Sequence, residues 1–145
     1  MSKELEGVTK ANAVWDFTSG AEGVFFQRLT DIKDMVDSLA SNDIAPDFKL
    51  LIHARATKFV TKTLDGTVFE GETLDKVPET HALLNELANT DGVDVLVCEV
   101  GMARHGVALD NIQPFTTNAD NVAVTSIVLQ NKGYALMHVD LTVAP

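Results

Sequence analysis

The chain has 145 residues, of which 46% are hydrophobic and 22% are charged, a composition typical of one globular domain with a hydrophobic core. Its formal net charge is −10, which argues against non-specific binding to nucleic acid and to an anionic membrane surface.

The single cysteine excludes an intramolecular disulfide and favours a reducing compartment. The N-terminal residues are polar and lack the apolar core of a signal peptide. No apolar run reaches the roughly 18 residues that cross a bilayer. We therefore expect a cytoplasmic protein with no membrane partner.

The first third of the chain predicts a strand, a helix and a second strand. Residues 11–18 are short, apolar and followed by a small-residue loop over 19–23, which favours a strand. Apolar residues spaced by three and four then predict a helix over 24–39. Residues 48–54 predict a second, buried strand.

The middle of the chain is harder to interpret. Residues 58–78 mix apolar residues with Thr, Gly and acidic residues, and we expect a broken helix followed by a hairpin-like loop or flap. Residues 80–88 predict a helix. Residues 93–98, Val-Asp-Val-Leu-Val-Cys, form the clearest strand in the sequence.

The last third predicts a short helix over 102–108, a short strand over 122–124, a helix over 125–131 and a last strand over 134–139. Strands that alternate with helices are joined by crossovers and become parallel.

We therefore expect one layered α/β domain over residues 1–145, in which a mostly parallel sheet is flanked by helices. Residues 1–10 would be a polar lead and residues 140–145 a tail.

Ligands of an open parallel sheet bind outside the carboxyl ends of its strands. The candidate site residues therefore lie at or just beyond the carboxyl end of a predicted strand, or on the short helix that follows Cys98. They are Ser19, Gly20, His53, Arg55, Cys98, Arg104 and His105.

Cys98 is the most informative of these residues. A cysteine just ahead of a helix can have its thiolate stabilised by the helix amides, and Arg55, Arg104 or a protonated His105 could add to this effect. Glu99 would oppose it. The alternative is that Cys98 only extends the preceding apolar run into the core, as free cysteines often do.

Several kinds of site have no support in the sequence. Four scattered histidines and one cysteine show no metal-ligand spacing, so we expect no metal. The glycine patterns of dinucleotide and phosphate loops are absent, as is the nucleophile elbow of serine hydrolases. We expect no cofactor, and an ordinary hydrolase or oxidoreductase is the least supported activity.

Residues 92–115, GVDVLVCEVGMARHGVALDNIQPF, together with residues 125–139, TSIVLQNKGYALMHV, resemble the DsrE/DsrF-like family of small sulfur-relay proteins. The shared features are a strand that ends in cysteine, a short helix, a hydrophobic–acidic step before a proline, and a late Leu-Gln and Gly-Tyr-Ala signature. The order of the earlier predicted elements fits as well.

The resemblance implies a flavodoxin-like layered fold and a homo-oligomer, either a trimer or a hexamer. It also implies that the strand-end cysteine carries a persulfide between a sulfur donor protein and an acceptor protein, and only Cys98 matches that position. Two features depart from the family: residues 59–78 are longer and more polar, which could cover or remodel the site, and Glu99 directly follows the cysteine.

Two hypotheses follow. The first is a sulfur carrier of the sulfurtransferase type, with the persulfide on Cys98; whether such a protein is an enzyme stays open. The second is an inactive homo-oligomeric binding or regulatory module in which Cys98 is buried. Its apolar content suits an assembly that covers part of its surface.

Overall fold

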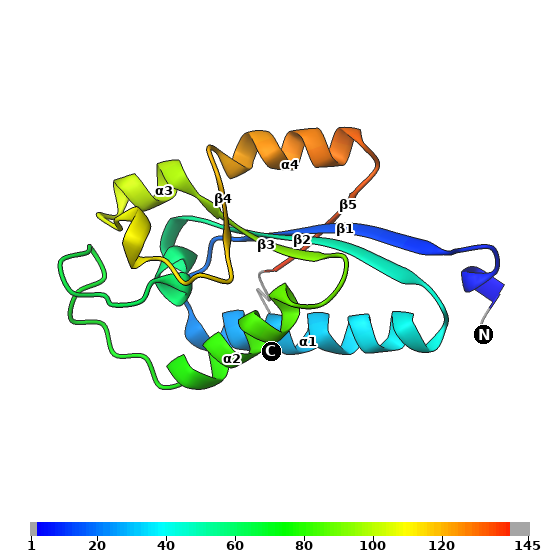
Figure 1. Cartoon of the computed structure of the whole chain (residues 1–145), viewed down its shortest axis with the longest axis horizontal. Helices are drawn as coiled ribbons and strands as arrows, with labels where there is room; N and C mark the ends of the chain where they lie inside the picture. The colour runs from blue at the N-terminus through cyan, green and yellow to red at the C-terminus, as the bar shows by residue number, and fades with distance from the viewer. Residues whose placement is uncertain (1–2, 140–145) are drawn as a thin grey trace, which may run out of the picture.

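The computed structural model describes residues 3–139, which form a twisted sheet between two layers of helices (Figure 1). The strands in this range are β1 (Lys10–Phe17), β2 (Ala45–Ile52), β3 (Val93–Cys98), β4 (Thr117–Ala119) and β5 (Ala135–Met137). The α-helices are α1 (Glu22–Ser41), α2 (Val77–Ala88), α3 (Glu99–Arg104) and α4 (Val122–Asn131). Short 3₁₀ helices are η1 (Lys3–Leu5), η2 (Ala54–Val60) and η3 (Leu109–Asn111).

The five strands lie in the order β4-β3-β2-β1-β5, and all four neighbouring pairs are parallel. The chain steps in one direction from β1 to β4 and then crosses back to β5. Right-handed crossovers in opposite directions place their helices on opposite faces, and α1 and α2 cover one face while α4 covers the other (Figure 1). The expected layered α/β fold with a parallel sheet is confirmed.

The hydrophobic core is unequal on the two faces of the sheet. Alternate residues of β1, β2 and β3 face α1 and α2 in a large cluster that includes Trp15, Leu50 and Val97. The residues between them face α4 in a small cluster of Val14, Leu51, Cys98 and Val122. Alternation along each strand produces this division. Cys98 therefore belongs to the α4 side.

Local sequence signals explain several boundaries. The apolar stripe of α1 buries Phe25, Leu29, Ile32 and Val36, as the predicted helix over 24–39 requires. Gly92 precedes β3 with a φ of +85°, and a Cβ there would lie 2.0 Å from the Pro46 carbonyl oxygen. Only glycine combines this backbone conformation with such a close approach.

The prediction for residues 122–124 is wrong. These residues open α4, because the Asn121 side chain accepts a hydrogen bond from the Ala123 amide at 3.0 Å and so caps the helix. The short strand of this region is β4, at residues 117–119. The apolar triplet Val-Ala-Val resembles a strand locally, but the Asn121 cap that precedes it favours the start of a helix.

Other boundaries move by a few residues. The short helix expected over 102–108 is α3, which begins at Glu99 directly after Cys98. The second strand ends at Ile52, so that His53 and Ala54 lie beyond it, and the last strand is limited to residues 135–137. Residues 140–145, expected as a tail, and residues 1–2 of the expected lead lie outside the described residues.

The uncertain middle region forms η2 and then an irregular segment, residues 61–76, which we call the strap. In place of a hairpin, its β pairing is a single antiparallel bridge between Thr61 and Ile112. Within residues 3–139, no helix is both long enough and apolar enough to cross a membrane.

Candidate functional site

Cys98 ends β3 and is the N-cap residue of α3. Its Sγ accepts a hydrogen bond from the Gly101 amide at 3.5 Å, and the residue is only 4% exposed. The sulfur therefore lies at the carboxyl edge of the sheet, next to an amide that would stabilise a negative charge, but it is packed in the cluster of Val14, Leu51 and Val122 on the α4 side. The amide contact fits the hypothesis of a reactive cysteine, and the low exposure fits the hypothesis of a buried one.

His53 lies on the other side of Gly101. A Cβ built on Gly101 would lie 3.5 Å from the His53 Cβ and 3.6 Å from the Cys98 Cβ. His53 Nε2 is 2.5 Å from Asp16 Oδ1, which links the ends of β1 and β2. The carboxyl edge thus brings Cys98 and His53 close together, as expected, although no hydrogen bond joins them in the described part of the chain.

The three cations suggested as partners of Cys98 have other surroundings. Arg55 Nη2 pairs with Glu72 Oε2 of the strap at 2.9 Å. His105 Nδ1 lies 2.6 Å from the Gly101 carbonyl oxygen and therefore donates to it, and its ring stacks on Phe69. Arg104 is exposed in the last turn of α3. Among the described residues, none of the three makes a hydrogen bond or ion pair with Cys98.

Ser19 and Gly20 form the loop between β1 and α1. The Ser19 Oγ accepts a hydrogen bond from the Ala21 amide at 3.1 Å, which shapes the entry to the helix. Gly20 lies against η2, since a Cβ there would lie 2.9 Å from both the Arg55 Cβ and the Lys58 Nζ. This loop therefore contacts Lys58, which the sequence did not single out.

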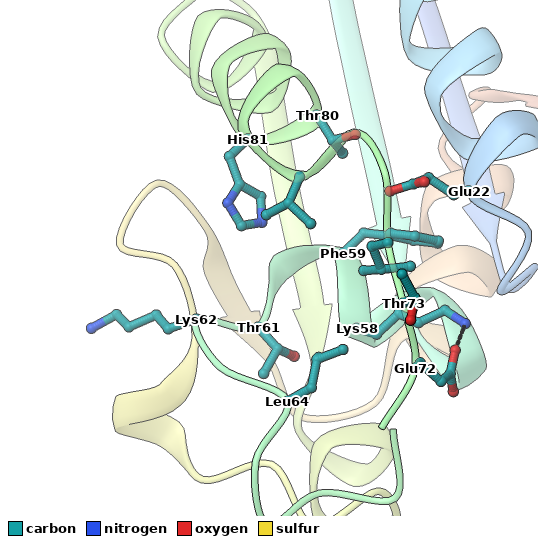
Figure 2. A pocket seen from close by; sticks show the side chains of 12 residues that line it. Glu22, Lys58, Phe59, Thr61, Lys62, Leu64, Glu72, Thr73, Thr80 and His81 are labelled. Atoms are coloured by element: carbon teal, nitrogen blue, oxygen red, sulfur yellow. Dashed lines mark hydrogen bonds and ion pairs between the residues drawn. The ribbon is translucent and has the colours of Figure 1, made fainter. Parts of the chain in front are cut away.

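A cavity of about 400 Å³ opens beside this loop, on the face of the sheet covered by α1 and α2 (Figure 2). Its walls come from the start of α1, from η2, from the strap and from the first turns of α2. The lining residues are Glu22, Lys58, Phe59, Thr61, Lys62, Leu64, Glu72, Thr73, Leu74, Val77, Thr80 and His81.

Two carboxylates hold the strap over this cavity. Glu72 accepts from Lys58 Nζ at 2.5 Å and from Arg55 Nη2 at 2.9 Å. Glu22 accepts from the backbone amides of Asp75 and Lys76 at 2.8 and 3.1 Å. Both anchors lie in the last five residues of the strap, where Glu72 fixes it to η2 and the amides of Asp75 and Lys76 fix it to the start of α1.

The polar side chains of Thr80 and His81, which line the cavity, differ in their hydrogen bonding. The Thr80 hydroxyl is buried and has no hydrogen-bond partner among the described residues. Burial lowers the pKa of His81, against a smaller opposing effect of a hydrogen bond to the Phe59 backbone. At neutral pH His81 is therefore uncharged, and its Nδ1 lies 3.4 Å from the Gln113 amide nitrogen.

Sequence reasoning missed Lys58, Glu72, Thr80 and Asp16. The one local signal was Lys58 itself, a lysine inside the otherwise uncharged run Ala56–Val60 of η2. Its partner Glu72 lies fourteen residues away on the strap, and no periodic pattern connects the two. Within residues 3–139, no group of three or more His, Cys, Asp or Glu residues is arranged to hold a metal ion.

Comparison with known proteins agrees with this architecture. Residues 25–139 match the model of the DsrE/DsrF-like family. An uncharacterized protein of Aquifex aeolicus (strain VF5) is 29% identical over 125 residues, which make up 86% of this chain and 54% of the relative. The chain thus spans about half the length of that curated relative.

Among solved structures, MTH1491, a protein of unknown function from Methanobacterium thermoautotrophicum, superposes with a TM-score of 0.67. The match covers 88% of this chain and 98% of that one at 9% sequence identity. It supports the fold alone.

Proposed function

Because the chain belongs to the DsrE/DsrF-like family, we propose that it is a sulfur carrier that holds a persulfide on Cys98 and passes it to a partner thiol. The observation that carries this proposal is the position of the only cysteine, at the carboxyl end of β3 with its Sγ hydrogen-bonded to the Gly101 amide. The partners would be a sulfur donor protein and an acceptor protein. A reducing, cytoplasmic setting suits the single free thiol.

The chemistry is two successive displacements at sulfur. The Cys98 thiolate attacks the outer sulfur of a donor persulfide, a new S–S bond forms, and the donor leaves as its thiolate. An acceptor thiolate then attacks the outer sulfur on Cys98 and regenerates the Cys98 thiolate. One sulfur atom moves in each step, and no outside oxidant or reductant is consumed. The Gly101 amide, which donates to Cys98 Sγ, would stabilise the sulfur anion before the first step and after the second.

Sulfur loading tests the proposal directly. The reduced protein is incubated with polysulfide, and its intact mass is measured with and without subsequent reductant. We expect the wild type to gain sulfur that reductant removes, and Cys98→Ser to gain none. Since the chain has one cysteine, labile sulfur has no other thiol to occupy. A wild type that gains no sulfur would contradict the carrier function.

A second candidate is the homo-oligomeric module with a buried cysteine. Its support is the low exposure of Cys98, 4%, and an apolar face on α4 formed by Val124, Ile127 and Val128. These residues are neighbours on one side of the helix, and a contiguous exposed apolar patch favours a protein contact. A Cys98 thiol that fails to react with a small alkylating reagent in the folded protein would favour this candidate.

The two candidates share the proposal of a homo-oligomer, a trimer or a hexamer. They differ in the effect that they predict for Cys98→Ser. A carrier loses sulfur transfer with this substitution, whereas a binding module keeps its assembly and its partner binding.

A further inference from the structure

Lys58 is a buried cation with too few acceptors. It is 4% exposed, and its ammonium carries three N–H donors. Within residues 3–139 its one hydrogen-bond acceptor is Glu72 Oε1. Its Nζ also lies 5.5 and 5.7 Å from the centroids of the Phe59 and Phe69 rings and close to Gly20. A buried ammonium normally finds acceptors for its donors. Because Lys58 lines the cavity, a ligand in the cavity could supply the missing acceptors.

The charges around Lys58 do not balance. Glu72 is shared by two cations, Lys58 and Arg55, so this cluster has one positive charge in excess. Glu22 also lines the cavity and adds a negative charge there, while its two carboxylate oxygens accept from the strap amides of Asp75 and Lys76. His81 is neutral at pH 7 because burial lowers its pKa. Lys62 extends away from the other lining side chains (Figure 2). The unused N–H donors of Lys58 therefore favour an anionic group on the ligand, and the Glu22 carboxylate in the same cavity disfavours more than one negative charge.

The other lining residues indicate which further chemical groups the ligand would have. Phe59, Leu64, Leu74 and Val77 contribute apolar surface, which an aliphatic or aromatic body would cover. Thr80 also lines the cavity, and its buried hydroxyl has no hydrogen-bond partner among residues 3–139, so a polar group of a ligand that reached it would complete its hydrogen bonding. The volume of about 400 Å³ lies in the range of small-molecule sites.

We propose that the cavity under the strap binds a small monocarboxylic acid with an apolar body, whose carboxylate contacts Lys58. The acid shares the ammonium with Glu72 and places its body between η2, the strap and α2. This site is separate from Cys98, which lies in the cluster on the α4 face of the sheet. Binding of the acid goes beyond the proposed sulfur transfer and does not depend on it.

The test uses the full-length protein and two acids, hexanoate and phenylacetate, with hexanamide and phenylacetamide as neutral controls. Binding is followed by methyl chemical shifts in NMR titrations at millimolar ligand. We expect the acids to shift the methyl signals of Leu64, Leu74 and Val77, and the amides to bind about tenfold more weakly, because they lack the charge. Acids that leave these signals unmoved, or amides that bind as well as the acids, would overturn the proposal.

Substitutions then test whether the carboxylate of the acid contacts Lys58. Lys58→Met should weaken acid binding about tenfold or more, whereas Lys132→Met, at an exposed lysine that follows α4 and is not among the residues lining the cavity, should leave it unchanged. Equal losses in both variants would mean a general charge effect and contradict the proposal. If Lys58→Met does not fold, Thr80→Val is the second test and should weaken binding severalfold. Cys98→Ser should bind the acids like the wild type, which separates this site from sulfur loading.

Discussion

The amide of Gly101 donates a hydrogen bond to Cys98 Sγ across the first turn of α3, with 3.5 Å between nitrogen and sulfur. This contact makes the cysteine both the end of a strand and the cap of a helix. The same thiol therefore has a structural role as a helix cap, and it would gain a chemical role if a sulfur donor reached it.

The cap predicts different effects of two substitutions at Cys98. Serine keeps an acceptor for the Gly101 amide, whereas alanine leaves that amide without one. Cys98→Ala should lower the free energy of unfolding by about 1 kcal/mol relative to Cys98→Ser, as for other lost N-caps. Urea denaturation of both variants measures the difference. Equal stabilities would mean that the Gly101 contact contributes nothing.

The close approach of Gly20 to η2 predicts a strong effect of one added methyl group. In Gly20→Ala the new Cβ would lie 2.9 Å from the Arg55 Cβ and from the Lys58 Nζ, and we expect a loss of about 1–3 kcal/mol in the free energy of unfolding. Gly23→Ala is the matched control, because Gly23 lies in α1 and a Cβ added there would have nothing within 4 Å. It should be stabilising by roughly 0.5–1 kcal/mol. A Gly20→Ala protein as stable as the wild type would contradict the packing of this loop.

The lowered pKa of His81 predicts a dependence of stability on pH. Burial keeps the folded-state pKa below the ordinary value, so the unfolded chain binds a proton more readily than the folded one. The contribution of neutral His81 is complete above about pH 6.5 and is lost as the pH falls through the folded-state pKa.

Unfolding of the wild type and of His81→Gln, measured at several pH values from about 8 to about 5, checks this prediction. The free-energy difference between the two should become less favourable to the wild type as the pH falls. The other histidines are present in both proteins and cancel in the difference. A difference that does not change with pH would show that His81 titrates alike in the folded and unfolded chains.

The apolar face of α4 predicts a surface variant that changes assembly. Ile127 is 59% exposed on that face, and Val68 is 58% exposed on the strap. If α4 forms the contact between subunits, Ile127→Asp should shift sedimentation toward a smaller species, because it buries a charge in the interface. Val68→Asp introduces the same charge at a similarly exposed valine and should leave the assembly unchanged. Equal sedimentation of all three proteins would argue against an interface on α4.

Local sequence patterns were enough to specify the layered fold and the position of Cys98 at the carboxyl edge of the sheet. The apolar stripe of α1 and the apolar block of β3 indicate a helix and a strand, and their alternation requires parallel strands with a shared edge. The same local reasoning failed at residues 122–124, where Asn121 caps a helix whose first residues resemble a strand.

Which groups meet at and beside that edge depended on the tertiary fold. Cys98 faces α4 and not α1 and α2 because of its place in the alternation of β3. Lys58 meets Glu72, and Glu22 meets the amides of Asp75 and Lys76, across gaps in sequence that carry no periodic signal. These contacts depend on how the strap folds back over η2 and α1, and long-range ion pairs of this kind are set by packing rather than by the local sequence.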